Sequence, residues 1–357
     1  MNRTPPSRRP SSRRATIGDV AERAGVSPMT VSRVINGESN VRDSTREAVQ
    51  EAIDALGFSP NKAARSLASA NQLQFALIYG NPSASFLSAM LLGVLEQARR
   101  SDTQIVVVEC DTEAQGINAI NNMIQSGVDG LILSPPLADS EYVLQILQKY
   151  TMPAVTIGTQ HVDHDIHSVQ IDDYAAGYRM TQHILDLGHR RIGFIAGNPA
   201  QRSSGLRLAG YLDALRDAGI DFADELVVQG YFTYRSGLAA ADQLLALPRR
   251  PTAIFASNDD MAAATVATAH RRRIDVPGDL TVCGIDDTLL ATTIWPEITT
   301  IHQPIVDMSH SAIDILEKGI RARRAGTATA AVHLTVDFRL VKRASDAPPA
   351  TALSEVS

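Results

Sequence analysis

The segment TIGDVAERAGVSPMTVSRVIN, residues 16–36, spaces several side chains so that they could read a nucleic acid. Arg33 could bridge the O6 and N7 atoms of a guanine, a contact that discriminates between bases by about 1–3 kcal/mol. Pro28 and Met29 could also meet base edges, with Met29 against a thymine methyl group. The residues that suit phosphate oxygens are Thr16, Thr30 and Ser32. These contacts require the side chains to project from one helix, which the neighbouring residues must build.

The surrounding residues predict two short helices joined by a tight turn. Thr16 can cap the first helix, because Asp19 follows at the spacing of a capping box, and Gly25 can end it in a left-handed conformation. Ser27 can cap the second helix. Apolar residues recur at helical spacing and should face inward: Ile17, Val20, Ala21 and Ala24 in the first helix, and Val31, Val34 and Ile35 in the second. The pattern favours a helix-turn-helix, although an ordinary pair of packed helices would share it.

A third helix is predicted over residues 43–56, with Val49, Ile53 and Leu56 on one face and Gly57 as its terminator. It would close a small three-helix core. The following segment NKAARSLA, residues 61–68, contains strong helix formers but almost no apolar face. A helix there would be marginal on its own, so it requires a partner subunit or DNA to order it.

Residues 16–69 closely resemble the N-terminal domain of the LacI/GalR family, through the motifs TVSRVIN and LGFSPNKAARSLAS and their spacing. The resemblance implies that residues 61–68 are the family's hinge helix, which folds on DNA and inserts Leu67 into the minor groove. The family often has a serine cap before the third helix, and Asp43 is expected to cap instead. The predicted DNA-binding residues are Thr16, Pro28, Met29, Thr30, Ser32, Arg33, Asn36, Asn61, Ala64 and Leu67.

Beyond residue 70, strand-like segments alternate with helix-like segments, which predicts parallel sheets covered by helices on both faces. The strand-like segments are 75–79, 105–109, 130–133, 154–157, 191–196, 226–229, 253–256 and 281–284. The length allows two such lobes. Several strands end in glycine or polar residues, including Gly158, Asn258 and Asp286. Ligands of open α/β sheets bind beyond the carboxyl ends of the strands, so a cleft between the lobes is the predicted ligand site.

The resemblance to the LacI/GalR family continues through this region, in IFASNDDMAAA, DLTVCGIDDT, PEITTIHQP and RLAGYLDAL. It implies a fold like that of periplasmic sugar-binding proteins, with two lobes, three crossovers and a ligand between the lobes. Position by position, the resemblance implies that the effector-binding residues are Ser85, Phe86, Arg207, Phe232, Asn258, Asp286 and Gln303. Asn258 is expected to face the ligand, while Asp259 serves as the cap of the following helix.

The chemistry of these side chains suits a neutral polyol. Carboxylate and guanidinium groups each bind vicinal hydroxyls in bidentate fashion, and an aromatic ring covers the C–H face of a sugar. Some members of the family bind purines in a similar pocket, so a nucleobase is the alternative effector. For two of these residues a purely structural role stays open, because Phe232 could be an ordinary core residue and Arg207 could pair with a surface acid.

Charge divides the chain into unlike parts. Residues 1–70 carry a net charge of +4 and the remainder carries −10. A basic head on an acidic body indicates a polyanionic partner. The predicted organisation is a disordered basic tail over 1–15, a helix-turn-helix domain over 16–60, a hinge over 61–70, a two-lobed effector-binding and dimerisation domain over 71–343, and a disordered tail over 344–357.

Other chemistry has little support in the sequence. It contains no P-loop, nucleophile elbow, GxGxxG or HExxH motif, and it therefore predicts neither an enzyme nor a cofactor. His161, His164 and His167 lack the spacing of a zinc motif, so a solvated loop is favoured over a metal site. No run of about 18 apolar residues, no secretory signal and no disulfide framework is present, which predicts a cytoplasmic protein that does not enter a membrane.

Together these features predict a homodimeric transcription regulator that binds double-stranded, pseudo-palindromic operator DNA, because two-fold symmetry pairs two recognition helices. A sugar-like effector would control operator affinity, and genes of carbohydrate uptake or breakdown are the expected targets. A sugar-binding receptor would explain the body but not residues 16–69. An enzyme with a fused DNA-binding head would need a catalytic constellation that the sequence lacks.

Overall fold

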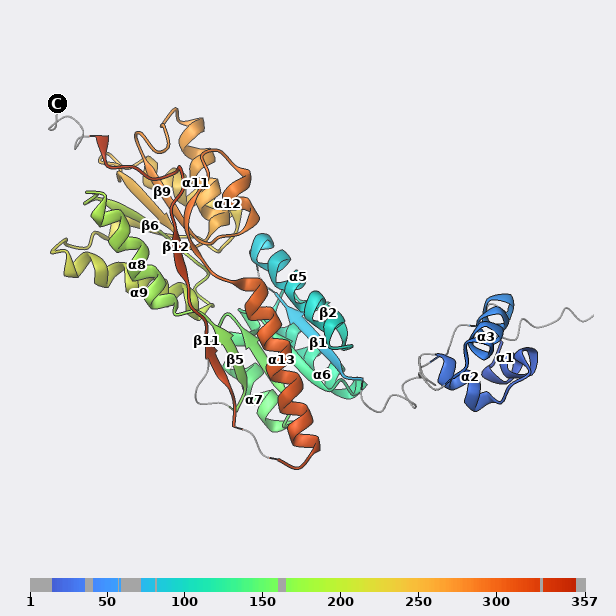
Figure 1. Cartoon of the computed structure of the whole chain (residues 1–357). Coiled ribbons are helices and arrows are strands. Elements are labelled where there is room, and N and C mark those ends of the chain that lie inside the picture. The colour runs from blue at the N-terminus through green and yellow to red at the C-terminus, as the bar shows by residue number, and fades with distance from the viewer. Residues whose placement is uncertain are drawn as a thin grey trace, which may run out of the picture. The chain divides into compact units, whose positions relative to one another are not determined.

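The computed structural model describes residues 15–35, 41–56, 58, 72–80, 82–159, 165–327 and 330–350. The chain forms two compact units, residues 1–72 and residues 73–357, which we term the head and the body (Figure 1). Several predictions fall outside the described residues: those for Asn36, Gly57, His161 and His164, and those for the hinge residues Asn61, Ala64 and Leu67.

In its described residues the head contains three helices: α1 (Ile17–Ala24), α2 (Pro28–Ile35) and α3 (Asp43–Leu56). Thr16 and Asp19 form the predicted capping box, and Gly25 ends α1 with a φ of 66°. The Thr30 amide donates to Ser27 Oγ at 3.2 Å, as expected for a residue that caps α2. These local interactions confirm the predicted helix-turn-helix. The core of the head is small, with Val20, Val31 and Val49 each contributing one fully buried side chain.

Two details of the head differ from the prediction. Ile17, expected to face inward, is 39% exposed at the start of α1. The expectation that Asp43 caps α3 is wrong, because Asp43 is the first helical residue and the amides of Thr45 and Arg46 bond to the Arg42 carbonyl. As an acid in the first turn, Asp43 still stabilises the helix through its dipole.

The body contains two α/β lobes. In the N-lobe, six parallel strands lie in the spatial order β2 (Gln104–Glu109), β1 (Gln74–Tyr79), β3 (Gly130–Leu133), β4 (Ala154–Ile157), β5 (His167–Gln170) and β11 (His333–Thr335). Helices α5 (Ala84–Arg100) and α13 (Ile305–Arg324) cover one face, and η1 (Leu137–Asp139), α6 (Glu113–Ser126) and α7 (Glu141–Lys149) cover the other. Alternate residues of β1 pack on each face: Phe75 and Leu77 on the first, Ala76 and Ile78 on the second.

The C-lobe sheet has the spatial order β7 (Val227–Gln229), β6 (Ile192–Ala196), β8 (Ala253–Ala256), β9 (Thr281–Asp286), β10 (Thr299–His302) and β12 (Arg339–Val341). Helices α8 (Asp173–Asp186) and α9 (Arg202–Asp217) cover one face. On the other face lie α10 (Tyr234–Leu245), α11 (Asp259–Arg271) and α12 (Leu289–Thr293), and η2 (Asp224–Leu226) precedes β7. None of the helices in the described ranges is long and apolar enough to cross a membrane.

Three crossovers connect the lobes, at residues 171–172, 303–304 and 336–338, as the resemblance implied. All eight predicted strands are present, with bounds within two residues of those expected. Four strands are additional: β5, β10, β11 and β12. Each has only three or four residues and a mixed composition, such as HSVQ or HLT, so none stands out as an apolar run. The last of them, β12, pairs antiparallel with β10, whereas the other strand pairs are parallel.

The prediction that the C-terminal tail is disordered from residue 344 is wrong for its first part. Ser345 is fully buried, its carbonyl accepts from the Val282 amide at 2.9 Å, and its hydroxyl accepts from the Thr299 amide. Asp346 Oδ2 lies 2.7 Å from His183 Nε2. Short polar side chains thus attach the segment to the C-lobe, a role that composition alone cannot reveal. Residues 351–357 lie outside the described part of the chain.

Candidate ligand cavity and DNA-reading helix

Helix α2 presents the predicted base-reading side chains on its outer face. Met29 is 66% exposed, and Pro28 and Arg33 are exposed as well. Met29 and Arg33 are four residues apart and therefore share one face of the helix. The opposite face is anchored, since Val31 and Val34 are buried in the core of the head. The outer face thus combines a cation with an apolar side chain near the N-terminus of the helix.

The hydroxyls predicted to meet phosphates take part in helix caps. Thr16 Oγ1 donates to Asp19 Oδ2 at 2.7 Å, and Thr30 Oγ1 lies 2.9 Å from Ser27 Oγ. Ser32 is half-buried in α2. A phosphate contact by Thr16 would compete with its cap for the single hydroxyl hydrogen. The DNA-binding roles of these residues stay predictions.

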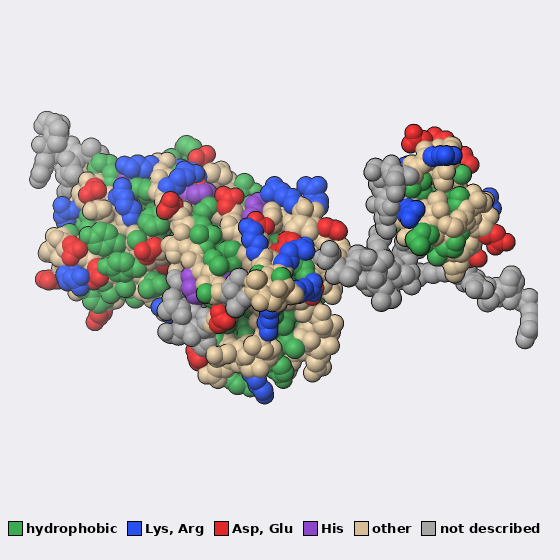
Figure 2. Space-filling model, turned by 60° about the horizontal axis from the view of Figure 1, so that its bottom comes forward, with side chains coloured by type: hydrophobic (Ala, Val, Ile, Leu, Met, Phe, Trp, Pro, Cys, Tyr) green, Lys and Arg blue, Asp and Glu red, His purple; other side chains and the backbone are tan. Residues whose placement is uncertain are grey.

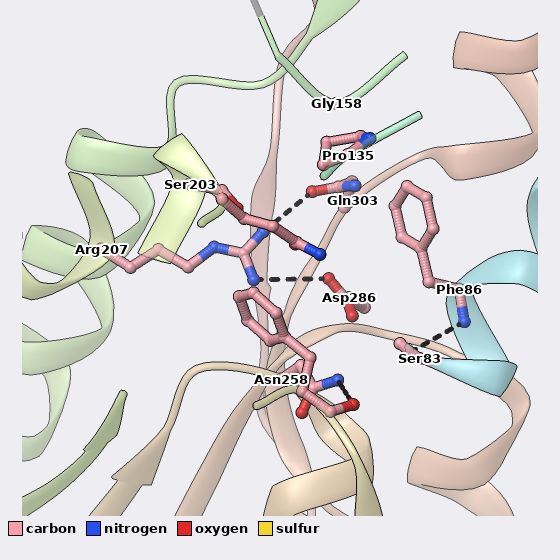
Figure 3. A pocket seen from close by; sticks show the side chains of 11 residues that line it. Ser83, Phe86, Pro135, Gly158, Ser203, Arg207, Asn258, Asp286 and Gln303 are labelled. Carbon is pink, nitrogen blue, oxygen red and sulfur yellow. Dashed lines mark hydrogen bonds and ion pairs between the residues drawn. The ribbon is translucent and has the colours of Figure 1, made fainter. Parts of the chain in front are cut away.

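A cavity lies between the lobes, beyond the carboxyl ends of strands from both sheets (Figure 3). The N-lobe contributes Ser83, Phe86, Pro135 and Gly158, the C-lobe contributes Gln201, Ser203, Arg207, Phe232, Asn258 and Asp286, and one crossover contributes Gln303. Six of the seven predicted effector-binding residues therefore line one cavity, and Ser85 does not. The volume is about 30 Å³, which holds a water molecule or two but not a sugar ring. A larger ligand requires the lobes to separate or the side chains to move.

Arg207, one of the C-lobe residues that line the cavity, is 5% exposed. Its Nε donates to Asp173 Oδ1 at 2.8 Å, its Nη1 donates to the Ser257 carbonyl, and its Nη2 donates to Gln303 Oε1 at 3.4 Å. Nη1 also lies 3.8 Å from Asp286 Oδ1 (Figure 3). Arg207 is therefore a buried cation whose three nitrogens each donate a hydrogen bond, and the interpretation as a surface ion pair is wrong.

Asp286 ends β9 in an unusual backbone conformation, with a φ of 118°. Its side chain is buried, and its Oδ1 has no hydrogen-bond partner among the described residues. Burial holds the pKa of Asp286 well above its ordinary value, although Arg207 acts in the opposite direction. A strained backbone and a buried carboxylate oxygen that accepts no hydrogen bond among the described residues both cost stability, which points to a function in recognition.

Phe232 closes the cavity on the C-lobe side, with a φ of 61°. Its ring lies against Gly197, where a Cβ atom would come within 2.0 Å of Phe232 Cζ. The Arg207 guanidinium carbon lies 5.7 Å from the ring centroid. Glycine at position 197 therefore makes room for the ring, and the ring faces both the cavity and the cation.

The expected roles of Asn258 and Asp259 are partly reversed. Asn258 caps α11, because its Oδ1 accepts from the Met261 amide at 3.0 Å, while its side chain also lines the cavity. Asp259 is fully buried and does not serve as the cap. It accepts hydrogen bonds from the amide and hydroxyl of Thr288 and from the hydroxyl of Thr300, so it ties α11 to the end of β9 and to β10.

Burial raises the pKa of Asp259 to about 7, although the hydrogen bonds from Thr300 and Thr288 oppose the shift. Between about pH 4 and pH 7 the folded state therefore keeps a proton that the unfolded state releases, so the stability that Asp259 contributes falls as the pH rises. Each pKa unit corresponds to about 1.4 kcal/mol. Asp259→Asn cannot ionise, and the unfolding free energy of the wild type should drop by a few kcal/mol relative to this variant over that range. Urea titrations followed by far-UV circular dichroism measure the difference, and a difference independent of pH would contradict the raised pKa.

Side chains from the two lobes bond directly across the cleft. Ser83 Oγ donates to Asp260 Oδ2 at 2.7 Å, and Ser85 Oγ donates to Asp260 Oδ1 at 3.2 Å. On the other side of the cleft, the Arg202 amide donates to Asp139 Oδ2 at 3.1 Å. The predicted ligand contact by Ser85 is thus replaced in this structure by a bond between the lobes. These contacts hold the lobes together around the small cavity.

Five lining residues were not in the predicted set: Ser83, Pro135, Gly158, Gln201 and Ser203. Gly158 belongs to the strand-end positions that the sequence does mark as cleft-facing. Gln201 and Ser203 follow β6 and open α9, so their place after a strand was the available signal. Ser83 caps α5 by accepting from the Phe86 amide at 3.2 Å, and such a local role gives no sign of the cavity.

Two known families match separate parts of the chain. The profile of bacterial regulatory proteins of the lacI family matches residues 16–61. The profile of the periplasmic binding protein-like domain matches residues 181–345, most of which belong to the C-lobe. The first match covers the three helices of the head.

Whole-chain relatives include transcription repressors. Catabolite control protein A of Priestia megaterium is 33% identical over 91% of this chain and 98% of its own length. The ribose operon repressor of Escherichia coli strain K12 is 34% identical over 85% of this chain and 92% of its own. The HTH-type transcriptional repressor PurR of Pectobacterium atrosepticum is 34% identical over 90% of this chain and 95% of its own.

Two similar solved structures contain ligands. The complex of the transcriptional regulator CelR with cellobiose is 31% identical, with a TM-score of 0.69 over 93% of this chain and 100% of that one. The Lac repressor dimer bound to operator and the anti-inducer ONPF is 27% identical, with a TM-score of 0.80 over 94% of this chain and 100% of that one. The likeness therefore extends over the head and both lobes.

A helix-turn-helix head joined to two lobes of this topology defines a transcription regulator with a periplasmic-binding-protein-like domain. The chain belongs to the lacI family of bacterial regulatory proteins. It is a DNA-binding repressor of that family and not an enzyme.

Proposed function

We propose that the protein represses genes of carbohydrate uptake or breakdown, and that a sugar-like effector in the cavity between the lobes controls its affinity for operator DNA. One observation carries the proposal. Asp286 Oδ1 and Gln201 Nε2 are buried without hydrogen-bond partners among the described residues, and both residues line the cavity. An unsatisfied acceptor and an unsatisfied donor suit a ligand with hydroxyl groups, which both donate and accept.

The charges around the cavity favour a neutral ligand. Arg207 is paired with Asp173 and lies within ion-pair distance of Asp286. Asp260 adds a further buried carboxyl near the cleft. A phosphorylated or carboxylated effector would meet these acids without a cation that is not already engaged, whereas a polyol can donate to Asp286 without bringing charge. The cellobiose complex and the ribose operon repressor among the similar proteins support the same class of effector.

A nucleobase is the second candidate, because two aromatic rings face the same cavity from opposite lobes. Phe86 comes from α5 and Phe232 from the loop before α10 (Figure 3 shows Phe86). Two rings could hold a planar base between them. The polar atoms of Asp286 and Gln201 would then bind the edge of the base.

Thermal unfolding of the full chain in the presence of single ligands tests this proposal. We expect a neutral mono- or disaccharide to raise Tm, since a ligand at about 100 times its Kd stabilises the folded state by about 2.7 kcal/mol. In Asp286→Ala the increase in Tm caused by the ligand should fall to a small fraction of the wild-type increase, because the ligand hydroxyls lose their acceptor. The matched control is Asp217→Ala, which removes an exposed acid of α9 and should keep the whole shift.

The outcome separates the candidates. A shift with purine bases, and none with sugars, would assign the effector to the second class. A full shift in Asp286→Ala would show that the ligand binds elsewhere. The best ligand is then added to a gel-shift titration with an operator duplex, selected by the protein from a randomised library, and a change in operator affinity completes the test.

We also infer that the protein acts as a homodimer on a pseudo-palindromic operator. Large apolar side chains are exposed on one side of the body: Leu92 and Leu95 on α5, Val107 on β2, and Leu289 and Trp295 on and after α12. In Figure 1, α5, β2 and α12 lie on the same side. Exposed apolar groups of this number favour an association surface, and the Lac repressor dimer on operator supports a second copy as the occupant.

The effector would act through the contacts between the lobes. If the lobes separate to admit a ring-sized ligand, contacts between them break, such as those of Asp260 with Ser83 and Ser85. The rotation that follows would change the spacing of the two heads in the dimer, through the hinge predicted to contain Asn61, Ala64 and Leu67. A coupling of about 1–3 kcal/mol between effector and operator is typical of such switches.

A further inference from the structure

The N-lobe carries a group of cations at the end opposite the cavity. Six exposed basic side chains lie at the C-terminal ends of three helices, and we term them the basic pole: Arg99 and Arg100 of α5, Lys149 of α7, and Arg321, Arg323 and Arg324 of α13. The bottom end of the body in Figure 1 comes forward in Figure 2, where Lys and Arg side chains are scattered over it with some Asp and Glu.

Hydrogen bonds place the end of α5 beside the first residues of the body. The Leu73 carbonyl accepts from the Gln104 amide at 2.9 Å. One residue earlier, the Thr103 amide donates to the Ala98 carbonyl in the last turn of α5, also at 2.9 Å. Arg99 and Arg100 are therefore adjacent to the point where the chain that comes from the head joins the body.

The end of α13 lies on the other side of the same point. The Gln74 amide donates to Asp129 Oδ2 at 2.8 Å, and Arg324 pairs with Asp129. Arg323 Nη1 donates to the Thr151 carbonyl at 2.7 Å, which brings α13 to the end of α7. The basic pole thus surrounds the attachment of the head from two directions.

Helix dipoles explain only part of this charge. The C-terminus of a helix carries about half a negative charge, which favours basic residues in its last turn. The three helix ends together account for only about one and a half negative charges against six cations. Acids lie among these cations: Asp129 pairs with Arg324, and Glu317 pairs with Arg321. Further acids nearby are Asp102, Asp165 and Asp314. The pole is therefore a mixed surface on which basic side chains gather, whereas residues 71–357 as a whole carry a net charge of −10.

We propose that the basic pole binds the phosphate backbone of DNA when the head occupies its operator. The proposal rests on the DNA binding that the family establishes, not on the identity of the effector. From Phe58 to Gln72 the chain spans at most about 50 Å, so DNA held by the head is within reach of the pole. DNA carries one charge per about 1.7 Å of its axis, and an acidic body beside it would be repelled without a basic surface. The pole would add affinity without reading sequence.

The test compares two adjacent arginine pairs in the full-length protein. Arg99→Gln with Arg100→Gln removes two charges from the pole. Arg249→Gln with Arg250→Gln removes two exposed charges before β8, at the opposite end of the body, and is the matched control. Each protein is titrated with a selected operator duplex and with a scrambled duplex of the same length, at several KCl concentrations.

For the pole variant we expect the slope of log Kd against log salt to become shallower by about one or more, since each phosphate contact contributes about 0.9. Its affinity at low salt should fall several-fold on both duplexes, with an unchanged ratio between them. The control pair should keep the wild-type slope. Arg99→Lys with Arg100→Lys should retain it as well, because the charge is kept.

Two results would overturn the proposal. An unchanged slope in the pole variant would mean that the pole makes no phosphate contact, and equal changes in both pairs would assign the effect to net charge. Arg323→Gln provides a second, independent removal of a pole charge, and the far-UV circular dichroism and Tm of each variant verify that it is folded. Operator binding by the wild type is measured in the same titrations. The result for the proposed phosphate contacts of the basic pole can therefore be distinguished from a lack of DNA binding by the protein itself.

Discussion

Arg207→Met should lower the free energy of unfolding of the body by about 3–5 kcal/mol at neutral pH, and it should abolish stabilisation by any cavity ligand. The guanidinium is the ion-pair partner of Asp173 and lies close to Asp286, and all three side chains are buried. Without it, two carboxyls stay in the interior with no compensating charge. Methionine keeps much of the volume, so the loss reports charge rather than a cavity. Urea unfolding followed by far-UV circular dichroism, at a fixed protein concentration, measures the change.

Two comparisons identify the cause of that loss. Burial holds the pKa values of Asp173 and Asp286 above their ordinary range, so protonation as the pH falls should restore part of the stability of the variant. Adding Asp173→Asn to Arg207→Met should restore part of it at neutral pH. The matched control is Arg216→Met on the same helix, whose side chain is 72% exposed and should cost less than about 1 kcal/mol. If Arg207→Met were as mild as this control, the buried ion pair would not hold the lobe together.

Arg33→Ala should weaken binding to a selected operator by about 1–3 kcal/mol for each half-site and should relax the preference for one base pair. Arg33 is exposed on the outer face of α2, so its removal leaves the core around Val31 and Val34 intact. Because a dimer carries two copies, the total loss can reach several kcal/mol. Gel-shift titrations against the operator and against single-base variants of each half-site measure both effects.

The comparison of specific and scrambled DNA decides the role of Arg33. A base contact predicts a large loss on the operator and a small loss on scrambled DNA. Equal losses on both would make Arg33 a phosphate contact, and the predicted base reading would be wrong. Arg23→Ala is the matched control, since Arg23 is also exposed but lies in the last turn of α1, outside the recognition helix. It should leave the preference between bases unchanged.

The parts of the fold that depend on local chemistry are those that sequence alone could predict. The capping box of Thr16 and the left-handed Gly25 bound α1 without help from other elements. The apolar strands can likewise be predicted, because a strand that is covered on both faces of its sheet appears in the sequence as a continuous apolar run. The missed strands β5, β10, β11 and β12 are short and owe their existence to neighbours distant in sequence. No local pattern encodes such pairing.

In the candidate site, too, sequence alone could identify some residues, whereas the roles of others depend on contacts with distant residues. Asp286 could be singled out because a carboxyl after a strand has no local purpose, and the structure leaves its Oδ1 without a hydrogen-bond partner among the described residues. Asn258 and Asp259 both look like caps, and only the tertiary contacts of Asp259 with Thr288 and Thr300 decide between them. The partner of Ser85, Asp260, lies 175 residues away. The ordered segment around Ser345 is hidden for a similar reason, because its bonds lie in the distant β9 and β10.

The three crossovers also restrict how the two lobes can move. A sliding motion of one lobe past the other would strain all three connections at once, whereas a rotation close to them strains them less. Gln303 lies in one of these connections, accepts from Arg207 and donates its amide to the Asp286 carbonyl at 3.2 Å. One of the connections between the lobes is therefore also part of the cavity lining. A ligand that fills the cavity would contact this connection directly, with no intervening residues between them.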